Sequence, residues 1–318
     1  VSGLSGLTGY RVRAYAVNSV GISYGATVQV TTLFVYVPGQ RGVFGGGDTV
    51  NVIDYITIST LSSAIDFGDL TSARTRLASC SSSTRGVFGG GSYLNVLDYI
   101  TIAIPGNAID FGDLTSARSE LTACSNNTRG IFGGGYRSGN SNVLDYITIT
   151  TPSSAADFGD LTSARFQLSA CSNSTRGIFG GGYAEINYNI IDYITISTAA
   201  NAVDFGDLTL VRYTLAACSN STRGVFGGGQ TTVAVNNVDY ITIATTGNAA
   251  DFGDLTLARY QLAACSSSTR GVFGGGAGPL NVIDYITIAT PGNATDFGDL
   301  TVARVNLAAC SDGHGGLS

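Results

Sequence analysis

The fold of this chain follows from the stretch Thr84-Arg-Gly-Val-Phe-Gly-Gly-Gly91, which Asn95-Val-Leu-Asp-Tyr-Ile-Thr-Ile102 and Asp110-Phe-Gly-Asp-Leu-Thr115 continue. This stretch is one copy of a unit that occurs six times. The Arg-Gly-(Val/Ile)-Phe-Gly-Gly-Gly element returns every 44 to 47 residues, at Arg41, Arg85, Arg129, Arg176, Arg223 and Arg270. A period of this length is typical of propellers, solenoids and other repeat arrays. The repeat is therefore the first feature to interpret.

Each unit contains four short segments with the composition of β-strands. In the second unit they cover residues 77–80, 86–89, 96–102 and 109–114. β-Branched residues dominate these segments, and Gly, Ser, Asn and Pro separate them. Four strands in a repeat of this length form the blade of a β-propeller. A solenoid is the alternative, but it needs capping ends, and none is visible in the sequence.

The pattern within one unit also resembles a known repeat family. An arginine (Arg74) precedes the innermost strand, a glycine pair follows Phe88, and aromatic residues occur in the third and fourth strands (Tyr99 and Phe111). This combination resembles the kelch repeat. Phe111 stands where kelch repeats usually have tryptophan, and its separation from Tyr99 is longer than typical, so a kelch relative and another propeller family with the same packing both remain open. The amino-acid sequence of the repeat is also similar to that of long repeat proteins of marine cyanophages.

The sequence therefore predicts an all-β protein with a six-bladed, kelch-like propeller over residues 33–318. Its second strands are expected to start near residues 41, 85, 129, 176, 223 and 270. The last unit ends with an extra first-strand segment, 305–310, which can complete the first blade and leave no exposed sheet edge. The alternative is that residues 33–37 supply this strand. We favour closure by residues 305–310.

Residues 1–32 do not belong to the repeat. Residues 10–18 alternate as a half-buried strand does, residues 21–25 are expected to form a turn, and residues 26–32 a second strand. The segment resembles the last hairpin of a fibronectin type III domain, with matches at Leu7, Tyr10, Arg13 to Asn18, Tyr24, Gly25 and Val30. It covers about a third of such a β-sandwich, so we expect the missing strands upstream in a longer protein.

Composition argues against several classes of protein. The net charge of −6 and the pI near 4.6 disfavour a nucleic-acid binder, and no apolar run is long enough to insert into a membrane. The cysteines occur once per repeat at the same place, too far apart for disulfides, so we expect buried free thiols. They are Cys80, Cys124, Cys171, Cys218, Cys265 and Cys310.

No catalytic residue set, metal site or cofactor is predicted. The single histidine, His314, lies in a glycine-rich segment and is expected to be solvated, so a catalytic triad or a zinc or copper site lacks its ligands. The Asp110 to Asp113 motif offers carboxylates to Ca²⁺, but a turn capped by its own aspartate is the simpler interpretation. Recurrent arginines (Arg74, Arg85) are expected to pair with recurrent aspartates (Asp98, Asp113) between blades and to fix their register.

Two sets of positions that differ between the units stand out: the loop between the second and third strands, and the two residues after the arginine that precedes the first strand. In a propeller both lie on the same face. Binding residues concentrate on loops held by a rigid scaffold, although drift in unconstrained loops gives the same pattern. The candidate binding residues on this face are Tyr93, Tyr136, Arg137, Tyr183, Glu185, Tyr188, Phe166, Tyr213 and Tyr260.

These features predict a non-enzymatic binding or structural module of a virion appendage, such as a phage tail fibre or adhesin. The expected partners are other structural proteins of the appendage, a cell-surface glycan or protein receptor, and further copies of the chain. A bacterial extracellular scaffold or adhesion protein is the alternative. A polysaccharide hydrolase or lyase is less favoured, because nothing distinguishes two of the many aspartates as a catalytic pair.

Overall fold

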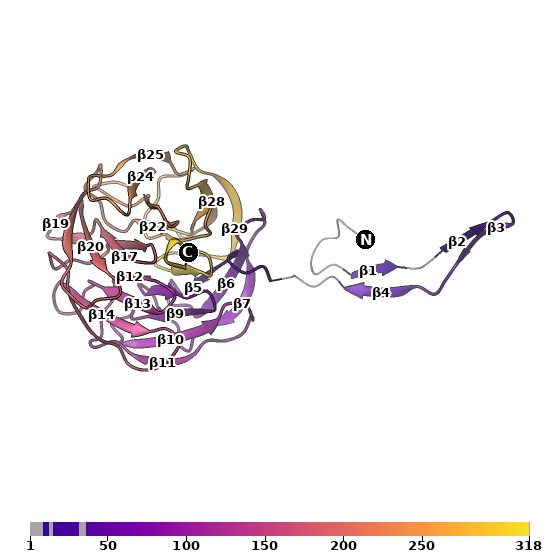
Figure 1. The fold of residues 1–318 in the computed structure, drawn as a ribbon, viewed down its shortest axis with the longest axis horizontal. Coiled ribbons are helices and arrows are strands. Elements are labelled where there is room, and N and C mark those ends of the chain that lie inside the picture. The colour runs from indigo at the N-terminus through magenta and orange to yellow at the C-terminus, as the bar shows by residue number, and fades with distance from the viewer. Residues whose placement is uncertain (1–8, 13–14, 32–35, 318) are drawn as a thin grey trace. The chain divides into compact units, whose positions relative to one another are not determined.

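The computed structural model describes residues 9–12, 15–31 and 36–317, and the chain divides into two units, Val1–Val37 and Pro38–Ser318. The second unit is a ring of six four-stranded antiparallel sheets (Figure 1). The predicted six-bladed β-propeller is therefore confirmed. No helix in the described part of the chain has the length and apolar character that crossing a bilayer requires.

Each blade has four strands, here lettered A to D from the central channel outward. Blade 1 is β30 (Ala308–Ser311), β5 (Arg41–Gly45), β6 (Val52–Thr57) and β7 (Ile65–Asp69); blade 2 is β8 (Ala78–Ser81), β9 (Arg85–Gly89), β10 (Val96–Thr101) and β11 (Ile109–Asp113); blade 3 is β12 (Thr122–Ser125), β13 (Arg129–Gly133), β14 (Val143–Thr148) and β15 (Ala156–Asp160). Blade 4 is β16 (Ser169–Ser172), β17 (Arg176–Gly180), β20 (Ile190–Thr195) and β21 (Val203–Asp207); blade 5 is β22 (Ala216–Ser219), β23 (Arg223–Gly227), β24 (Asn237–Thr242) and β25 (Ala250–Asp254); blade 6 is β26 (Ala263–Ser266), β27 (Arg270–Gly274), β28 (Leu280–Thr287) and β29 (Thr295–Arg304). A small hairpin of β18 (Tyr183–Ala184) and β19 (Ile186–Asn187) forms the B-to-C loop of blade 4.

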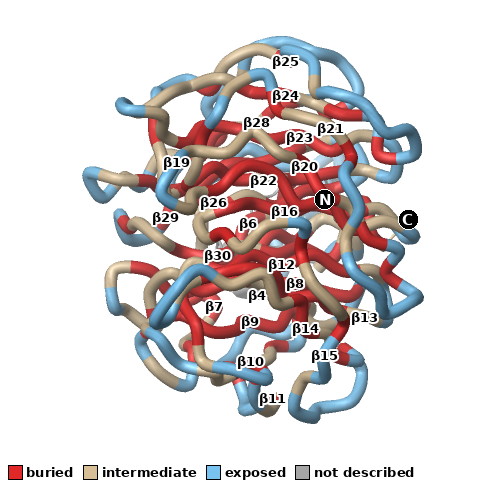
Figure 2. Tube along the Cα trace, turned by 90° about the vertical axis from the view of Figure 1, so that its left-hand side faces the viewer, coloured by how far each residue is buried: buried red, intermediate tan, exposed pale blue. Residues whose placement is uncertain are grey.

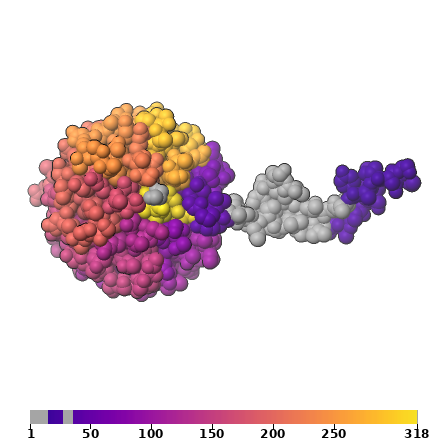
Figure 3. All heavy atoms as spheres, viewed as in Figure 1, coloured from indigo at the N-terminus to yellow at the C-terminus, as the bar shows by residue number. Residues whose placement is uncertain are grey.

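The C-terminal strand completes the first blade. β30 pairs antiparallel with β5, and Cys310 lies opposite Val43. In Figure 3 the yellow atoms of the C-terminal part accordingly lie beside the indigo atoms of the first repeat. After β30, the Asp312 carboxylate accepts hydrogen bonds from the amides of Gly39 (2.9 Å) and Arg41 (2.8 Å). The two ends of the ring are thus joined by the pairing of β30 with β5 and by charge-assisted hydrogen bonds to the Asp312 carboxylate. Of the alternative strand, 33–37, residues 33–35 lie outside the described residues.

Glycines in the B strands let adjacent blades pack closely, and Figure 2 shows the inner strands as the buried layer. A Cβ on Gly180 would lie 2.7 Å from Phe226 of the next blade, and one on Gly177 would lie 2.6 Å from the Cys124 sulfur of the preceding blade. The same two contacts occur at all six blade interfaces. The six cysteines are buried free thiols, as predicted, because each fills the space above a neighbouring glycine.

The predicted pairing of arginines with aspartates is confirmed for the arginines that precede the A strands and wrong for those that begin the B strands. Arg74 pairs with Asp98 of the next blade at 2.5 Å, both fully buried. The other five pairs are Arg118–Asp145, Arg165–Asp192, Arg212–Asp239, Arg259–Asp284 and Arg304–Asp54. For Arg85 the expected pairing with a recurrent aspartate is wrong. Arg85 lies 4.3 Å from the centre of the Tyr99 ring and donates a hydrogen bond of 2.8 Å to a carbonyl of the third blade, because a cation can stack on an aromatic face.

The Asp-Phe-Gly-Asp segments are outer strands, so their interpretation as capped turns is wrong. In β11, Phe111 is buried and packs edge-on against Tyr99, with ring centroids 5.9 Å apart. Gly112 has φ of +135°, and a Cβ there would lie 2.7 Å from the backbone of Ser153 in the next blade. This glycine therefore permits close approach between blades. Within the described residues, no group of three or more His, Cys, Asp or Glu side chains is placed to hold a metal ion.

The N-terminal unit is a hairpin in which β1 (Gly9–Val12) pairs with β4 (Val28–Thr31) and β2 (Tyr15–Asn18) pairs with β3 (Gly21–Tyr24). The predicted turn at residues 21–25 is wrong, because the turn lies at residues 19–20. The Asn18 side chain sets it by accepting hydrogen bonds from the amides of Val20 (2.8 Å) and Gly21 (3.1 Å). Leu7, Arg13 and Thr32, which also entered the prediction, lie outside the described residues.

Candidate binding face and central channel

The propeller has two faces with different loops. The A-to-B and C-to-D turns form one face, here called the turn face, and the B-to-C loops and D-to-A connections form the other, here called the loop face. The B-to-C loops, which differ in length from blade to blade, and the variable pairs of the D-to-A connections are on the loop face, as the strand order requires. The C-to-D loops of the turn face also differ in sequence, but they keep one length in all blades. The two variable sets are hydrogen-bonded to each other there. Tyr136 in one B-to-C loop and Ser119 in the adjacent connection exchange backbone hydrogen bonds of 2.8 and 2.9 Å.

Four of the predicted binding residues form a continuous aromatic row across blades 3 to 5. Ring centroids are 5.3 Å apart from Tyr136 to Phe166, 5.5 Å from Phe166 to Tyr183, and 5.5 Å from Tyr183 to Tyr213. All four side chains are partly exposed. Aromatic residues are enriched at the binding surfaces of proteins, because they offer large contact area with few rotatable bonds.

The other five predicted residues lie on the same face but outside the aromatic row. Tyr93, Arg137 and Glu185 are exposed, and Tyr188 and Tyr260 are partly buried. Tyr93 and Glu185 have φ of 59° and 69°, the left-handed region that non-glycine residues seldom adopt. The structure therefore brings four of the nine residues together and leaves the rest distributed around them.

A second set of residues surrounds the opening of the central channel, and we did not select it from the sequence. Each of these residues is the second of the two variable residues that follow the arginine before an A strand. All six have φ between 55° and 61°. The amide of each donates a hydrogen bond of 2.8 to 3.0 Å to the carbonyl of the preceding one, so that six bonds close a circle. We call this set the mouth ring: Arg76, Glu120, Gln167, Thr214, Gln261 and Asn306. The variable pairs contained these positions, but we chose the aromatic members.

The mouth ring carries one ion pair among neutral polar groups. A guanidinium nitrogen of Arg76 lies 2.8 Å from a carboxylate oxygen of Glu120, whose side chain is only 9% exposed. Burial raises the pKa of Glu120, while Arg76 and a hydrogen bond with Gln167 oppose that shift. The Thr214 hydroxyl donates to the carbonyl of Tyr213 at 2.6 Å. Below the ring, the channel is lined by Leu77, Leu121, Leu168, Leu215, Leu262 and Leu307.

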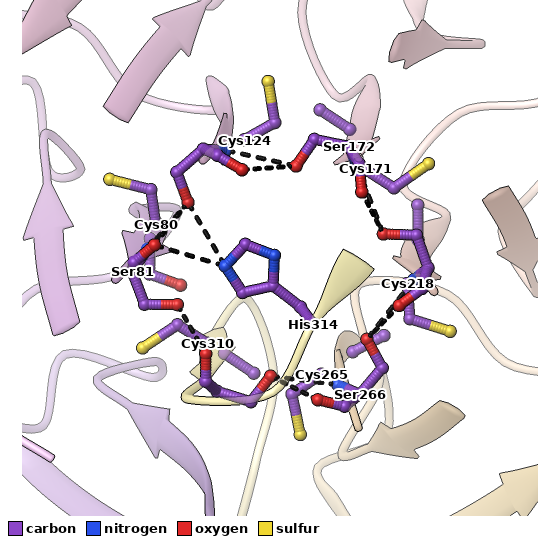
Figure 4. A pocket seen from close by; sticks show the side chains of 18 of the residues that line it. Cys80, Ser81, Cys124, Cys171, Ser172, Cys218, Cys265, Ser266, Cys310 and His314 are labelled. Atoms are coloured by element: carbon purple, nitrogen blue, oxygen red, sulfur yellow. Dashed lines mark hydrogen bonds between the residues drawn. The ribbon is translucent and has the colours of Figure 1, made fainter. Parts of the chain in front are cut away.

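At the turn face, a ring of serines narrows the channel. Each hydroxyl donates to the carbonyl of the serine in the preceding blade, at 2.6 to 2.8 Å, around the complete circle. The members of this serine ring are Ser81, Ser125, Ser172, Ser219, Ser266 and Ser311. The cysteine that precedes each serine points its sulfur away from the centre (Figure 4).

The C-terminal segment closes the channel inside the serine ring, so the expected solvated position of His314 is wrong. Figure 4 shows the imidazole at the centre of the ring. Its Nε2 lies 3.2 Å from the carbonyl oxygen of Ser81, and its Nδ1 accepts a hydrogen bond from the amide of Gly316 at 3.1 Å. A Cβ on Gly316 would overlap the carbonyl oxygen of Ser125, which is why only glycine fits there. These partners assign a neutral imidazole protonated at Nε2.

The titration of His314 provides a direct test of this closure. Burial lowers its pKa from 6.5 to about 4, because the charged imidazolium would lose its hydration, while the hydrogen bond with the Ser81 carbonyl opposes the shift. As His314 is the single histidine, its imidazole signals in an NMR titration are unambiguous. The unfolded chain binds a proton below pH 6.5 and the folded chain only near pH 4. Stability from this group is therefore complete above pH 6.5 and falls by up to about 3 kcal/mol as the pH drops to 4.

The control for this prediction is His314→Gln, which removes the group while leaving every carboxylate in place. The difference in the free energy of unfolding between the two proteins should change between pH 6.5 and 4 and be constant above that range. A His314 pKa near 6.5 would contradict the buried position.

A scan against protein-family models found no match for this chain, and a search of curated proteins found none either. The fold and the site geometry therefore stand on the sequence and the structure.

Proposed function

We propose that this chain is a non-enzymatic binding module of a virion appendage, similar to a phage tail fibre or adhesin, and that its loop face recognises a receptor. The observation that carries the proposal is the segregation of variation. Six blades with nearly identical strands build the scaffold, and the loops that differ in length all lie on one face, where four variable residues form the aromatic row. A rigid scaffold with one variable surface suits recognition.

The path of the chain supports the use of this face. β5 starts at the turn face, where Asp312 binds the amides of Gly39 and Arg41, and the C-terminal segment lies there as well. Both segments thus lie on the turn face of the propeller, opposite the loop face. We further propose that the propeller is kelch-like and follows a fibronectin-type module, on the sequence resemblances given above.

Two exposed isoleucines provide a matched test of the face. Ile186 on the loop face is 63% exposed, and Ile104 on the turn face is 67% exposed. We expect added purified chain to compete with virus particles for attachment to host cells. The Ile186→Ala variant, combined with Tyr183→Ala, should compete at least tenfold less well, whereas Ile104→Ala should compete as the unchanged chain does. Equal competition by all three proteins would contradict recognition by the loop face.

The assignment to an appendage has its own test. Gold-labelled antibodies raised against the propeller should decorate the appendages of intact virus particles in electron micrographs. Labelling confined to the surface of a bacterial cell, with none on particles, would contradict the virion assignment and favour an extracellular scaffold.

A further inference from the structure

We propose that the mouth ring is a binding site for one neutral sugar ring, the terminal residue of a glycan. The inference rests on the proposed function, since it names the class of ligand that the centre of the loop face would take. It is carried by the shape of the channel, by the backbone of the ring and by the chemistry of its side chains.

The channel forms a cup that opens on the loop face. The mouth ring is its rim, and the leucines named above line its wall. The serine ring and His314 close it at the opposite end. A ligand therefore reaches the cup from the loop face and cannot pass through. Closed, concave sites with a few convergent polar groups are where small ligands bind.

The backbone of the mouth ring shows that its side chains are present for a reason beyond the scaffold. All six residues are in the left-handed region, where glycine costs least. None of the six is glycine, and Thr214 is β-branched, which makes it an outlier at φ of 55°. The rest of each unit uses glycine freely at positive φ, for example at Gly181 and Gly182. Strain of this kind gathers at functional sites.

The polar groups of the mouth ring suit a polyhydroxylated ligand. Its backbone amides are all used in the circle of hydrogen bonds, so recognition falls to the side chains. Gln167, Gln261 and Asn306 carry carboxamides, which both donate and accept hydrogen bonds. Sugar hydroxyls likewise donate and accept.

The charge of the mouth ring favours a neutral sugar over a charged one. Its charged residues are Arg76 and Glu120, and they neutralise each other at 2.8 Å. An acidic or basic sugar would have to compete with this pair, in which the Glu120 carboxylate is largely buried, or remain without a partner, and both are costly. The aromatic members of the variable pairs, Phe166, Tyr213 and Tyr260, directly precede ring residues and lie where the next sugars of a glycan would extend.

The test uses the intact chain and a panel of methyl glycosides of glucose, galactose, mannose and N-acetylglucosamine, with methyl glucuronide and methyl glucosaminide as charged comparators. Saturation-transfer NMR should detect at least one neutral glycoside with single-site saturation. The triple variant Gln167→Gly, Gln261→Gly and Asn306→Gly should bind it at least tenfold more weakly. Glycine adopts the left-handed region without steric cost, so this variant should keep its thermal unfolding midpoint.

Thr49→Gly is the matched control, because Thr49 is an exposed loop-face residue with φ of 61° outside the mouth ring. It should leave glycoside binding unchanged. Binding of no neutral glycoside, equal binding by the triple variant, or binding of the charged glycosides alone would overturn the inference. Failure of this test leaves the competition by Ile186 variants unaffected, so the two proposals are separable.

Discussion

Replacing Asp239 by asparagine is expected to lower the free energy of unfolding by about 3–5 kcal/mol. Arg212 in the connection from blade 4 to blade 5 and Asp239 in blade 5 are 2.9 Å apart and fully buried. The guanidinium also donates to the carbonyls of Asn237 (2.7 Å) and Phe226 (3.1 Å), and Thr209 donates to the carboxylate at 2.6 Å. Burial lowers the pKa of Arg212 and Asp239 opposes that shift, so removing the carboxylate leaves a buried cation without its partner.

The matched control for this variant replaces both partners. Arg212→Met combined with Asp239→Leu removes the two charges together, and it should cost much less than Asp239→Asn alone. Chemical denaturation of the full chain measures both differences. If the double variant were less stable than Asp239→Asn, the ion pair would add net stability. That result would contradict the account in which the pair chiefly fixes the register between blades.

Truncating Phe226 to alanine is the second change with a large expected effect, also about 3–5 kcal/mol of unfolding free energy. Phe226 is fully buried, and its ring occupies the space that a side chain at Gly180 of the preceding blade would need. The truncation therefore opens a cavity between two blades, which the rigid sheets fill only in part.

Phe166→Ala is the comparison for Phe226→Ala, because Phe166 is a partly exposed member of the aromatic row. Its loss should cost much less, since surface changes usually stay within about 0.5 kcal/mol. Similar losses for the two phenylalanines in denaturant unfolding would contradict the distinction between scaffold and working surface.

The architecture was predictable because the repeat encodes it locally. The Arg-Gly-Val-Phe-Gly element at Arg85 indicated a strand, and its period indicated the number of blades. The glycines of that element allow close approach, and their partners are the Phe side chain of one neighbouring blade and the Cys side chain of the other. These partners come from other repeats, and a single sequence does not state which residues they are.

The errors have the same physical origin. Arg85 and Asp113 were matched by charge, but the Tyr99 ring is nearer to that arginine and offers it an alternative partner. His314 looked solvated among glycines, whereas those glycines let the segment enter the serine ring. The mouth ring was overlooked because left-handed backbone at non-glycine residues leaves no mark in the sequence. Local pattern predicts strands well and contacts between distant segments poorly.

The most direct measurement of the central claim, that the scaffold is uniform and the loop face does the binding, uses a bulky label on each face in turn. The native thiols are buried, and burial raises the pKa of Cys171 to about 12, so a new surface cysteine reacts selectively with a maleimide-linked polymer. The account predicts that polymer on Ile186→Cys abolishes competition for host-cell attachment and that polymer on Ile104→Cys does not. Loss of competition from the Ile104 position alone would contradict it.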